Sequence, residues 1–467
     1  MRLAIIFAAA AMLAAPLAQA AEKQAAEKQT KEDYARVPMP PGFQVMNTEL
    51  EGNVFADAKG RTLYKWIYKP ARVGASGDPR GKSTCTGEVF KTEGGHMSPY
   101  PPDLRLPDAD TRPSCVDMWP PVLADRNAKP VGAWTIVTRE DGNKQWAYDE
   151  QPLYTAALDR MPGDTVGGTN RDMSEGVSAR PAVRHPVGPP PAVPPGFDVI
   201  STVNGRLLVT ATVNASVYTF AKDTASKSTC AAECLREWSP MLAPEFAKTF
   251  GEWSLVERSP GVRQWAFRGK PLYTHVADMP FRSYRGRSVD GSDVPGWSLV
   301  YAQRAPEIPS DLKRQVTPGG EVLADRRGHT IYVYFCHDDA DDQLICDHPD
   351  TPQDYRIAVC GGGNQERCAI RFPMVQASAG AKSNSRAYSI MEINRLTGKR
   401  AQAGEKDALR VWAYRDRPLY VFDGEPSPAV GDRAPGDIEA DGLGEHRAQR
   451  HGFTAFWLRD DFYGRAN

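Results

Sequence analysis

The densest group of metal-ligating residue types is the run Cys336-His337-Asp338-Asp339-Ala340-Asp341-Asp342. Carboxylate oxygens suit calcium, whereas cysteine together with histidine suits zinc. The run lacks the glycine and the distal glutamate of an EF-hand loop. A solvated acidic loop therefore explains it best, and we expect no cofactor. The alternative is weak calcium binding by Asp338, Asp339, Asp341 and Asp342.

Eight cysteines fall into local groups: Cys85 and Cys115; Cys230 and Cys234; Cys336, Cys346, Cys360 and Cys368. Redox-active pairs are typically separated by two residues, a spacing that lowers a thiol pKa. Three residues separate Cys230 from Cys234, so we expect a structural disulfide there. Cys85 and Cys115 form the same pair around an insertion. Cys360 and Cys368 take this position in the last repeat, which leaves Cys336 and Cys346 to pair across an added loop.

Signatures of catalysis are missing from the sequence. Gly81-Lys82-Ser83-Thr84 lacks the glycine that a phosphate loop needs five residues earlier, and Ser226-Lys227-Ser228-Thr229 stands at the same place before Cys230, which marks a repeat element. The eight histidines form no His-Glu-x-x-His motif, and there is no Gly-x-Ser-x-Gly elbow. A triad assembled by the fold need not be local in sequence, but the motifs favour a protein that is not an enzyme.

A nine-residue pattern, Trp-Ala-aromatic-x-x-x-Pro-Leu-Tyr, organises the elements that must position these groups. It occurs at 146–154, 265–273 and 412–420, and recurrence at constant spacing indicates an internal repeat. Its aromatic ends favour half-buried strands, and its polar centre followed by proline favours a turn and a strand start. We expect a hairpin whose aromatics form core. The alternative is a stacking platform for a sugar or another flat ligand.

One order of features recurs in each domain. An apolar-Tyr pair comes first (Leu63-Tyr64, Val217-Tyr218, Ile331-Tyr332), then the cysteines, the nine-residue pattern and an acidic loop. That loop contains Asp159, Asp278 or Asp423. Residues 55–64 resemble 146–154, which suggests half-repeats. Helical periodicity is nearly absent, so we predict an all-β fold of three tandem related small β-domains, each of two hairpin-like half-repeats, with disulfides.

Pro-Pro-Gly-Phe at 40–43 and again at 194–197 marks the start of the first two domains. The expected organisation is a signal peptide at 1–20, a mobile leader at 21–36, domain 1 at 37–178, a Pro-rich linker at 179–195, domain 2 at 196–304, and domain 3 at 305–467 with the Cys/Asp-rich insertion. No such linker separates the last two domains, so we expect them to pack together. Trp297 and Trp457 close domains 2 and 3, and domain 1 has no late tryptophan.

The N-terminus has the features of a secretory signal peptide. Arg2 precedes an apolar run at 3–17, and Ala18-Gln19-Ala20 follows as a cleavage site. Residue 21 is alanine and not cysteine, so no lipid anchor is implied. No later segment approaches the ~20 apolar residues of a membrane span. The net charge of −1 excludes a global basic field for nucleic acid. We expect a periplasmic or secreted protein.

The second domain contains Tyr218-Thr219-Phe220-Ala221-Lys222-Asp223, then Lys227-Ser228-Thr229-Cys230, Cys234 and Trp238-Ser239-Pro240. This combination resembles the bacterial secreted-repeat family of predicted lipoproteins with a Tyr-x-aromatic-x-x-Asp motif. The first domain has Tyr64 and Trp66 but lacks the aspartate, and the third has Tyr332 and Tyr334 with Asp338 one place late. The resemblance implies no established biochemical activity.

We therefore expect an exported, non-enzymatic binding or structural module of the bacterial cell envelope that contacts an envelope glycan or a protein partner. The candidate ligand contacts are the motif residues Tyr64, Trp66, Tyr218, Phe220, Asp223, Tyr332 and Tyr334. The alternative is an envelope enzyme or a redox or metal accessory protein that uses the insertion of domain 3.

Overall fold

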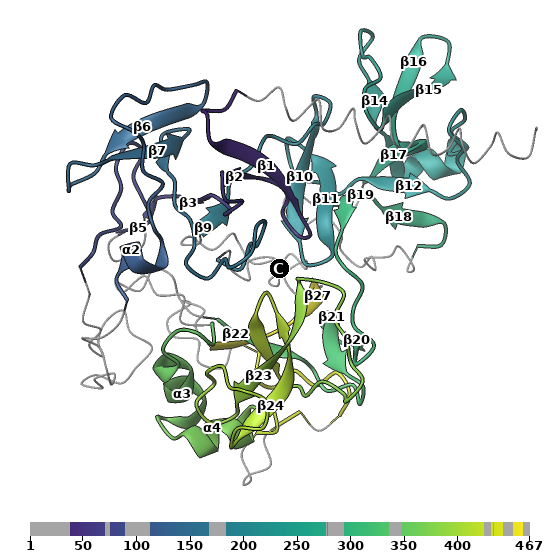
Figure 1. Cartoon of the computed structure of the whole chain (residues 1–467). Helices are drawn as coiled ribbons and strands as arrows, with labels where there is room; N and C mark the ends of the chain where they lie inside the picture. The colour runs from purple at the N-terminus through teal and green to yellow at the C-terminus, as the bar shows by residue number, and fades with distance from the viewer. Residues whose placement is uncertain are drawn as a thin grey trace, which may run out of the picture.

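The computed structural model describes residues 38–70, 75–88, 113–167, 184–276, 278, 294–335, 348–424, 431–432, 434–441 and 452–460. Its elements are mostly strands, arranged in several small antiparallel sheets with a few short helices (Figure 1). The all-β class predicted from the sequence is confirmed. In this part of the chain, no helix is both long enough and apolar enough to cross a membrane.

The elements fall into three repeats that follow one another along the chain. Repeat 1 contains β1 (Phe43–Thr48), β2 (Gly52–Asp57), β3 (Tyr64–Trp66), β4 (Lys69–Pro70), β5 (Ala75–Ser76), α2 (Cys115–Met118), β6 (Trp134–Thr138), β7 (Lys144–Tyr148), β8 (Gln151–Pro152) and β9 (Arg184–Pro186). Repeat 2 contains β10 (Phe197–Thr202), β11 (Gly205–Thr210), β12 (Tyr218–Phe220), η3 (Ala232–Arg236), β13 (Trp238–Pro240), β14 (Leu242–Ala243), β15 (Trp253–Ser259), β16 (Val262–Phe267), β17 (Lys270–His275), β18 (Trp297–Leu299) and β19 (Tyr301–Arg304). Repeat 3 contains β20 (Leu312–Thr317), β21 (Gly320–Asp325), β22 (Tyr332–Phe335), α3 (Asp354–Gly361), α4 (Gln365–Arg371), β23 (Tyr388–Asn394), β24 (Ala408–Tyr414), β25 (Arg417–Tyr420), β26 (Gly452–Ala455) and β27 (Trp457–Asp460).

Each repeat folds into a small and a larger set of paired strands. In repeat 3 the sheets have the orders β20-β21-β27 and β23-β24-β25-β22-β26. Repeat 2 has β10-β11-β19 beside a sheet built on β14-β16-β17-β12-β18. In repeat 1 the corresponding sheets are β1-β2, β6-β7-β8 and β3-β9. The strand β9 lies within the segment expected to be a Pro-rich linker, so part of that segment pairs with repeat 1.

The nine-residue pattern forms a tight hairpin in every repeat, as predicted. Its two central residues have positive φ, with values of 48° and 65° at Asp149 and Glu150 and 48° and 59° at Arg415 and Asp416. Two such residues define the type I′ turn, whose twist matches that of paired strands. Repeat 2 places Gly269 at the second position, with φ 71°, where a glycine has no steric penalty.

Two half-repeats meet at a pair of tyrosines. The Leu63 N–H donates to the Phe55 carbonyl at 2.9 Å, and the Leu153 N–H donates to the Trp146 carbonyl at 2.9 Å. The same bond in both halves confirms that they are related hairpin units. Tyr64 and Tyr154 then exchange backbone hydrogen bonds of 2.8 and 2.9 Å, and the equivalent tyrosines pair in repeats 2 and 3.

The first hairpin of each repeat ends in a threonine-to-glycine tip, which we call tip 1 (48–52), tip 2 (202–205) and tip 3 (317–320). In each tip the threonine hydroxyl donates to the glycine carbonyl, at 2.9, 2.8 and 3.3 Å respectively. This bond closes the turn without using side chains from elsewhere. The intervening residues are therefore free to contact another repeat.

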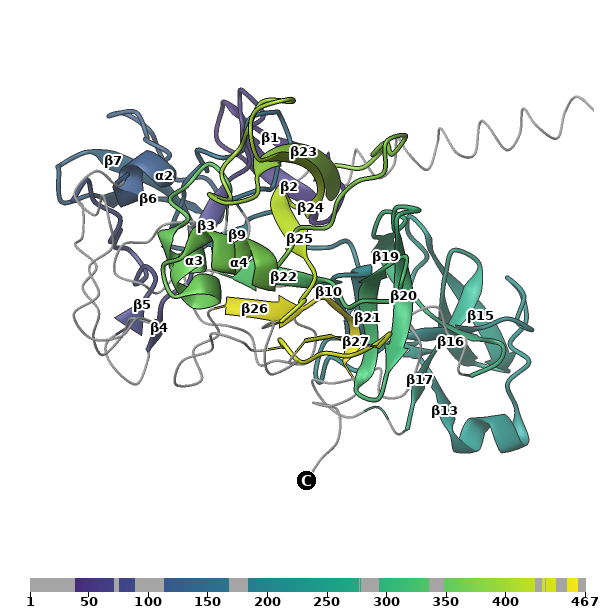
Figure 2. The same ribbon diagram turned by 90° about the horizontal axis from the view of Figure 1, so that it is seen from below.

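Tips 1 and 2 join the three repeats into one body. Leu50 of tip 1 and Val203 of tip 2 belong to the same buried cluster as Tyr388 and Trp412 of repeat 3. In the view of Figure 2, β1 and β2 overlap with β23 and β24, and Glu49 of tip 1 accepts a hydrogen bond from the Ser385 hydroxyl just before β23, although more than three hundred residues separate these segments in sequence. Repeat 1 thus packs against repeat 3 as well, which the Pro-rich spacer did not predict.

The substitution Leu50→Ala is expected to lower the free energy of unfolding by about 2–5 kcal/mol, the range for removing a buried leucine side chain. Leu50 is only 6 % exposed although it lies in a turn. Chemical denaturation followed by tryptophan fluorescence measures the change. The matched control is Leu123→Ala, because Leu123 is 56 % exposed and its loss should change stability by less than about 0.5 kcal/mol. Equal effects for the two variants would mean that tip 1 does not hold the repeats together.

Candidate functional site

The second aromatic of the predicted binding motif, which is buried in repeats 1 and 3 and partly buried in repeat 2, is in each repeat the outer member of a three-layer arrangement. In repeat 2 the rings of Phe220, Trp297 and Trp238 stack in that order, with centroids 4.5 and 3.6 Å apart. In repeat 3 Phe453 stacks on Phe372 with centroids 3.7 Å apart, and the Tyr334 ring packs against Phe453 at an interplanar angle of 53°. Trp66 and Tyr334 are each 3 % exposed, so a ligand would have to open the stack to reach them. Their role in ligand binding stays a prediction.

Repeat 1 builds the same stack with an arginine as its middle layer. The Arg184 guanidinium lies 4.1 Å from the Trp66 ring and 4.4 Å from the Trp119 ring, and the residue is fully buried. One of its nitrogens donates to the Cys115 sulfur at 3.3 Å. Arg184 is thus the counterpart of Trp297 and Phe453, because all three pair with the motif aromatic. Because this position holds an arginine in repeat 1, a search of domain 1 for a late tryptophan does not find it. In repeat 3 the equivalent of Trp297 is Phe453 and not Trp457.

The first tyrosine of the motif is also buried, and in repeats 1 and 3 its hydroxyl donates a hydrogen bond to a carboxylate. Tyr64 donates to Asp159 at 2.8 Å, and Tyr332 donates to Asp432 at 2.9 Å. Burial raises the pKa of both carboxyls, to about 7 in each case. The counterpart of Asp159 is therefore Asp432 and not Asp423. The sequence carried a signal for this, because Asp-Arg-x-Pro-Gly-Asp occurs at 159–164 and again at 432–437.

Asp223 is the centre of a buried network in repeat 2. It accepts hydrogen bonds from the Thr229 N–H and hydroxyl at 2.7 Å each and from the Tyr273 hydroxyl at 2.5 Å. Ser228 bonds to Tyr273 and accepts from Arg258. Arg258 also reaches the Cys230 carbonyl at 2.8 Å. The Lys-Ser-Thr-Cys element is therefore a structural connector between the disulfide and the nine-residue hairpin.

Repeat 1 contains the same network around Asp78. The Thr84 N–H and hydroxyl donate to it at 2.7 Å each, and Tyr154 donates at 2.7 Å. Arg139 completes the network through Ser83 and the Cys85 carbonyl. Lys69 stands at the motif position of the aspartate, as noted from the sequence, and Asp78 takes over the role that Asp223 has in repeat 2. The β4–β5 insertion moves the aspartate away from Trp66, but both aspartates precede their threonine by six residues, a spacing that could have revealed Asp78.

Repeat 3 fills this position with apolar side chains. The strand registers place Ile393 where repeats 1 and 2 have Arg139 and Arg258, and Val411 where they have a glutamine. Both Ile393 and Val411 are fully buried. The polar network and this apolar pair are therefore two ways to fill the same space in the core of a repeat.

Three of the four expected disulfides are present: Cys85–Cys115, Cys230–Cys234 and Cys360–Cys368. Cys336, Cys346 and the acidic run with Asp338, Asp339, Asp341 and Asp342 lie outside the described residues. Among the residues that the structure does describe, no three His, Cys, Asp or Glu side chains converge to hold a metal ion.

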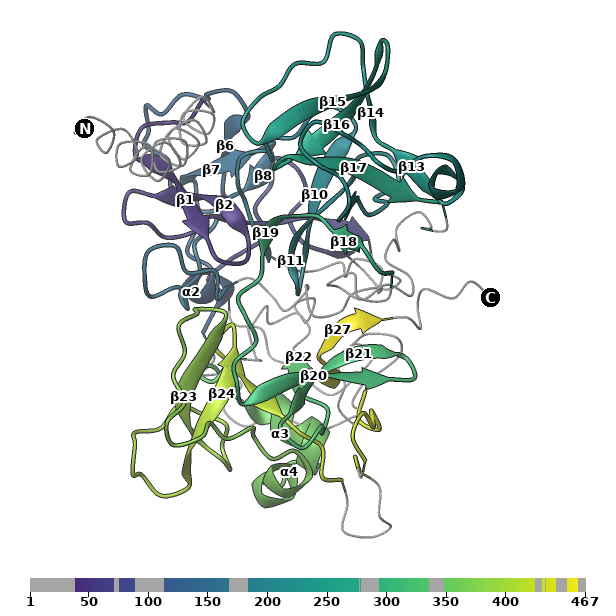
Figure 3. The ribbon, with the colours of Figure 1, turned by 90° about the vertical axis from the view of Figure 1, so that its right-hand side faces the viewer.

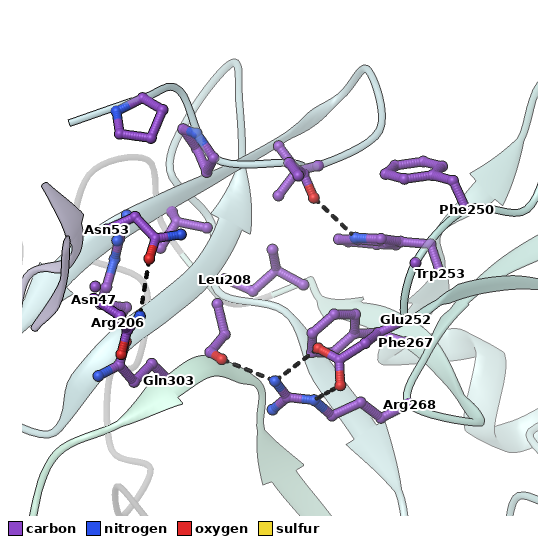
Figure 4. A pocket seen from close by; sticks show the side chains of 18 residues that line it. Asn47, Asn53, Arg206, Leu208, Phe250, Glu252, Trp253, Phe267, Arg268 and Gln303 are labelled. Carbon is purple, nitrogen blue, oxygen red and sulfur yellow. Dashed lines mark hydrogen bonds and ion pairs between the residues drawn. The ribbon is translucent and has the colours of Figure 1, made fainter. Parts of the chain in front are cut away.

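A pocket of about 470 Å³ lies between repeat 1, the proline segment that follows it, and repeat 2. Figure 4 shows two facing walls. One wall is mainly aromatic and the other presents amide and guanidinium groups: Phe250, Glu252, Trp253, Phe267 and Arg268 on the first, and Asn47, Asn53, Arg206 and Gln303 on the second. The Trp253 Nε1–H donates to the Ala192 carbonyl at 3.2 Å and so fixes the proline segment at the edge of the pocket.

The two charged side chains of the aromatic wall, Arg268 and Glu252, pair with each other. Arg268 donates two hydrogen bonds of 2.8 Å to the Glu252 carboxylate and lies 4.6 Å from the Phe267 ring. A bidentate pair of this kind is geometrically specific. The wall therefore offers aromatic surface with a neutral polar rim, a combination suited to an uncharged ligand.

The same face of repeat 3 is already occupied by a segment of this chain. Arg415 comes directly after Tyr414, which pairs with Tyr388. In the same way, Arg268 comes directly after Phe267, which pairs with Trp253. Tip 1 lies on this face. Glu49 accepts from the Ser385 hydroxyl at 2.9 Å and from the Arg386 and Ala387 N–H groups at 2.8 Å each. Glu51 accepts from Arg415 at 2.7 Å. In repeat 3 the equivalent of the pocket wall is therefore a docking face for a hairpin tip.

Comparison with known proteins agrees with the motif resemblance. Residues 135–172 match the model of a family described as a secreted repeat of unknown function. The matched segment contains the nine-residue hairpin and the loop of Asp159. No curated protein and no solved structure matches the chain. The resemblance to a secreted repeat is thus confirmed over this segment.

The stack predicts a test in repeat 1. Arg184→Ala should lower the free energy of unfolding by about 3–5 kcal/mol, as expected when one partner is removed from a buried charged arrangement. Burial raises the pKa of Asp78, and the charge of Arg184 opposes that rise. Arg184→Phe should restore part of the loss, because repeat 3 has Phe453 in this position. Denaturant midpoints for the two variants provide the comparison, and an alanine variant as stable as the phenylalanine variant would contradict the stack.

The raised pKa values predict a specific pH dependence. Between pH ~4 and ~7 an unfolded aspartate releases its proton while Asp159 in the folded protein keeps it, so stability falls as the pH rises through this window. Above ~7 both states are ionised and the penalty is constant. The free energy of unfolding of Asp159→Asn relative to the wild type should therefore increase from pH ~4 to ~7. Thermal melts at several pH values measure this, and Asp432→Asn should behave alike. Parallel curves for mutant and wild type would refute the assignment.

Proposed function

We propose that the protein is an exported, non-enzymatic binding module of the bacterial cell envelope, and that its binding site is the pocket on repeat 2. The match to a secreted repeat supports export. One observation supports the site: the same face of repeat 3 holds a docked polypeptide segment, tip 1, through Arg415 and the N–H groups before β23. A face that binds a hairpin tip in one repeat is a suitable protein-binding face in another.

The walls of the pocket suit a protein ligand more than a polysaccharide chain. Phe250 is half-buried, and its ring lies nearly parallel to that of Trp253, with centroids 6.3 Å apart. Aromatic side chains of this kind anchor partner side chains at the centre of interfaces. The Arg268–Glu252 pair orients the polar rim without a net charge. A partner that inserts an uncharged turn between the two walls would bury these rings and keep both charges paired.

The test compares two phenylalanines of the same loop. Phe250 lines the pocket, whereas Phe246 is 86 % exposed and does not. The mature chain is immobilised and incubated with envelope extract, and captured proteins are quantified by mass spectrometry. Phe250→Ala should reduce capture of the specific partners by about tenfold or more, the loss expected for an anchoring aromatic. Phe246→Ala should capture them as the wild type does.

Parallel incubation with envelope polysaccharides distinguishes the glycan alternative. Retention of polysaccharide that is lost in Phe250→Ala, with no protein lost, would replace the protein partner by a glycan at the same site. Equal capture by both variants and the wild type would remove the pocket as the binding site.

A further inference from the structure

We infer that the partner is a polypeptide segment that places an acidic side chain beside Lys65, next to the uncharged part that enters the pocket on repeat 2. The inference rests on the proposed function and adds the chemistry of the partner. Two observations carry it: a second pocket continues the first one, and a half-buried lysine lines that second pocket.

The second pocket, which we call the lysine pocket, has a volume of about 480 Å³ and adjoins the pocket on repeat 2. The two pockets share part of their lining: Asn53, Pro189, Pro191, Val199 and Arg206. They therefore form one groove along the contact between the first hairpins of repeats 1 and 2. Figures 1 and 3 show β1 and β2 beside β10 and β11, and here the Arg206 Nη1–H donates to the Glu51 carbonyl at 2.6 Å.

Equivalent hairpin ends of repeats 1 and 2 line the two halves of this groove. In the pocket on repeat 2 this end is Phe267 with Arg268, and in the lysine pocket it is Tyr148 with Asp149. The strand registers give the two aromatic residues the same position. On repeat 3 the same hairpin end, at Arg415, holds tip 1. This face thus already binds a polypeptide segment once within the chain.

Tip 1 binds repeat 3 through an apolar and an acidic side chain that are neighbours in sequence. Leu50 enters the core of repeat 3, and Glu51 accepts a hydrogen bond from Arg415 at 2.7 Å. In repeat 1 the position of Arg415 holds Asp149, so a cation for an acidic side chain must come from another element. Lys65 of β3 is that cation, because it lines the same pocket as Asp149.

The Lys65 ammonium is well placed to receive a carboxylate. The residue is half-buried, and among the residues that the structure describes it makes no hydrogen bond and no ion pair. Burial lowers the pKa of Lys65, the nearby Asp149 opposes this shift, and Arg80 adds to it. An opposite charge in contact with a buried ammonium favours its charged form. An incoming carboxylate would therefore offset the cost of burying this charge.

The titratable side chains that line the lysine pocket include more bases than acids: Lys65, Arg184, His185 and Arg206 against Glu51 and Asp149. Arg184 is enclosed between two tryptophan rings, and the Glu51 carboxylate is held by Arg415. Asp149 is exposed to solvent. An acidic side chain therefore matches the charge of this pocket, and a basic one does not.

Peptide binding followed by fluorescence anisotropy tests the inference. The probes are labelled peptides in which one to four glycines separate a leucine from a glutamate, and matched peptides with glutamine or lysine in place of the glutamate. The mature wild type should bind a glutamate peptide about three- to tenfold more tightly than its glutamine form, the range for a half-buried ion pair. Equal binding of the two forms at every spacing, or no binding of either, overturns the inference.

Three variants assign the preference to Lys65. Lys65→Gln should remove the preference for glutamate. The matched control Lys129→Gln should keep it, because Lys129 is exposed in the same repeat and lines neither pocket. Lys65→Glu should bind the lysine peptide more tightly than the glutamate peptide, a gain that an unfolded variant would not show. A preference for glutamate that survives in Lys65→Gln contradicts the inference.

Failure of the inference can be told apart from failure of the proposed function. If Phe250→Ala loses peptides or envelope partners while Lys65→Gln binds as the wild type does, only the inference fails. If neither variant changes peptide binding or capture, both fail. An acidic polysaccharide that the wild type retains and Lys65→Gln loses, with no peptide bound, would make the ligand an anionic glycan and overturn the polypeptide partner.

Discussion

The pairing of two tyrosines at the centre of each repeat is the interaction on which the rest of the structure depends. Tyr64 and Tyr154 join the half-repeats of repeat 1 through reciprocal backbone hydrogen bonds. Their side chains then set two buried polar sites, because one hydroxyl donates to Asp159 and the other to Asp78. A buried hydroxyl without a partner would cost free energy. The carboxylates and their loops must therefore be placed wherever the tyrosines pair.

The repeats satisfy this constraint with different chemistry. Repeats 1 and 2 connect the second tyrosine to an aspartate, a serine, a threonine and an arginine, and the arginine also reaches a cysteine carbonyl. Repeat 3 puts Ile393 and Val411 where the others have arginine and glutamine. The middle layer of the aromatic stack varies in the same way between Arg184, Trp297 and Phe453. What is kept is a planar group packed against an aromatic ring: the Arg184 guanidinium on Trp119, Trp297 on Trp238 and Phe453 on Phe372.

Assembly of the repeats depends on the tips as well as on the proline segment, which pairs with repeat 1 through β9 and accepts a hydrogen bond from Trp253 of repeat 2. Tips 1 and 2 insert Leu50 and Val203 into one core in repeat 3, so the contact is made by short turns that their own threonine hydroxyls close. The face that receives tip 1 is repeated on repeat 2, where it forms the aromatic wall of the pocket (Figure 4). The proposed binding surface on repeat 2 thus corresponds to the face that holds tip 1 on repeat 3, and Glu252 pairs with Arg268 there as Glu51 of the tip pairs with Arg415.

The sequence by itself determined the local units of this protein. Spacing within the nine-residue pattern was enough to predict the hairpins, and the grouping of Cys230 with Cys234 was enough to predict their disulfide. Both features depend on residues that are close in the chain. The tertiary structure alone decided which distant groups meet. Arg184 occupies a tryptophan position, which no residue-type pattern indicates, and Asp78 is displaced by an insertion. The pocket combines Asn47, Trp253 and Gln303, and the burial of Leu50 depends on a strand pair more than three hundred residues away. Such contacts follow from how whole repeats pack, since side-chain burial is settled by long-range neighbours and not by local periodicity.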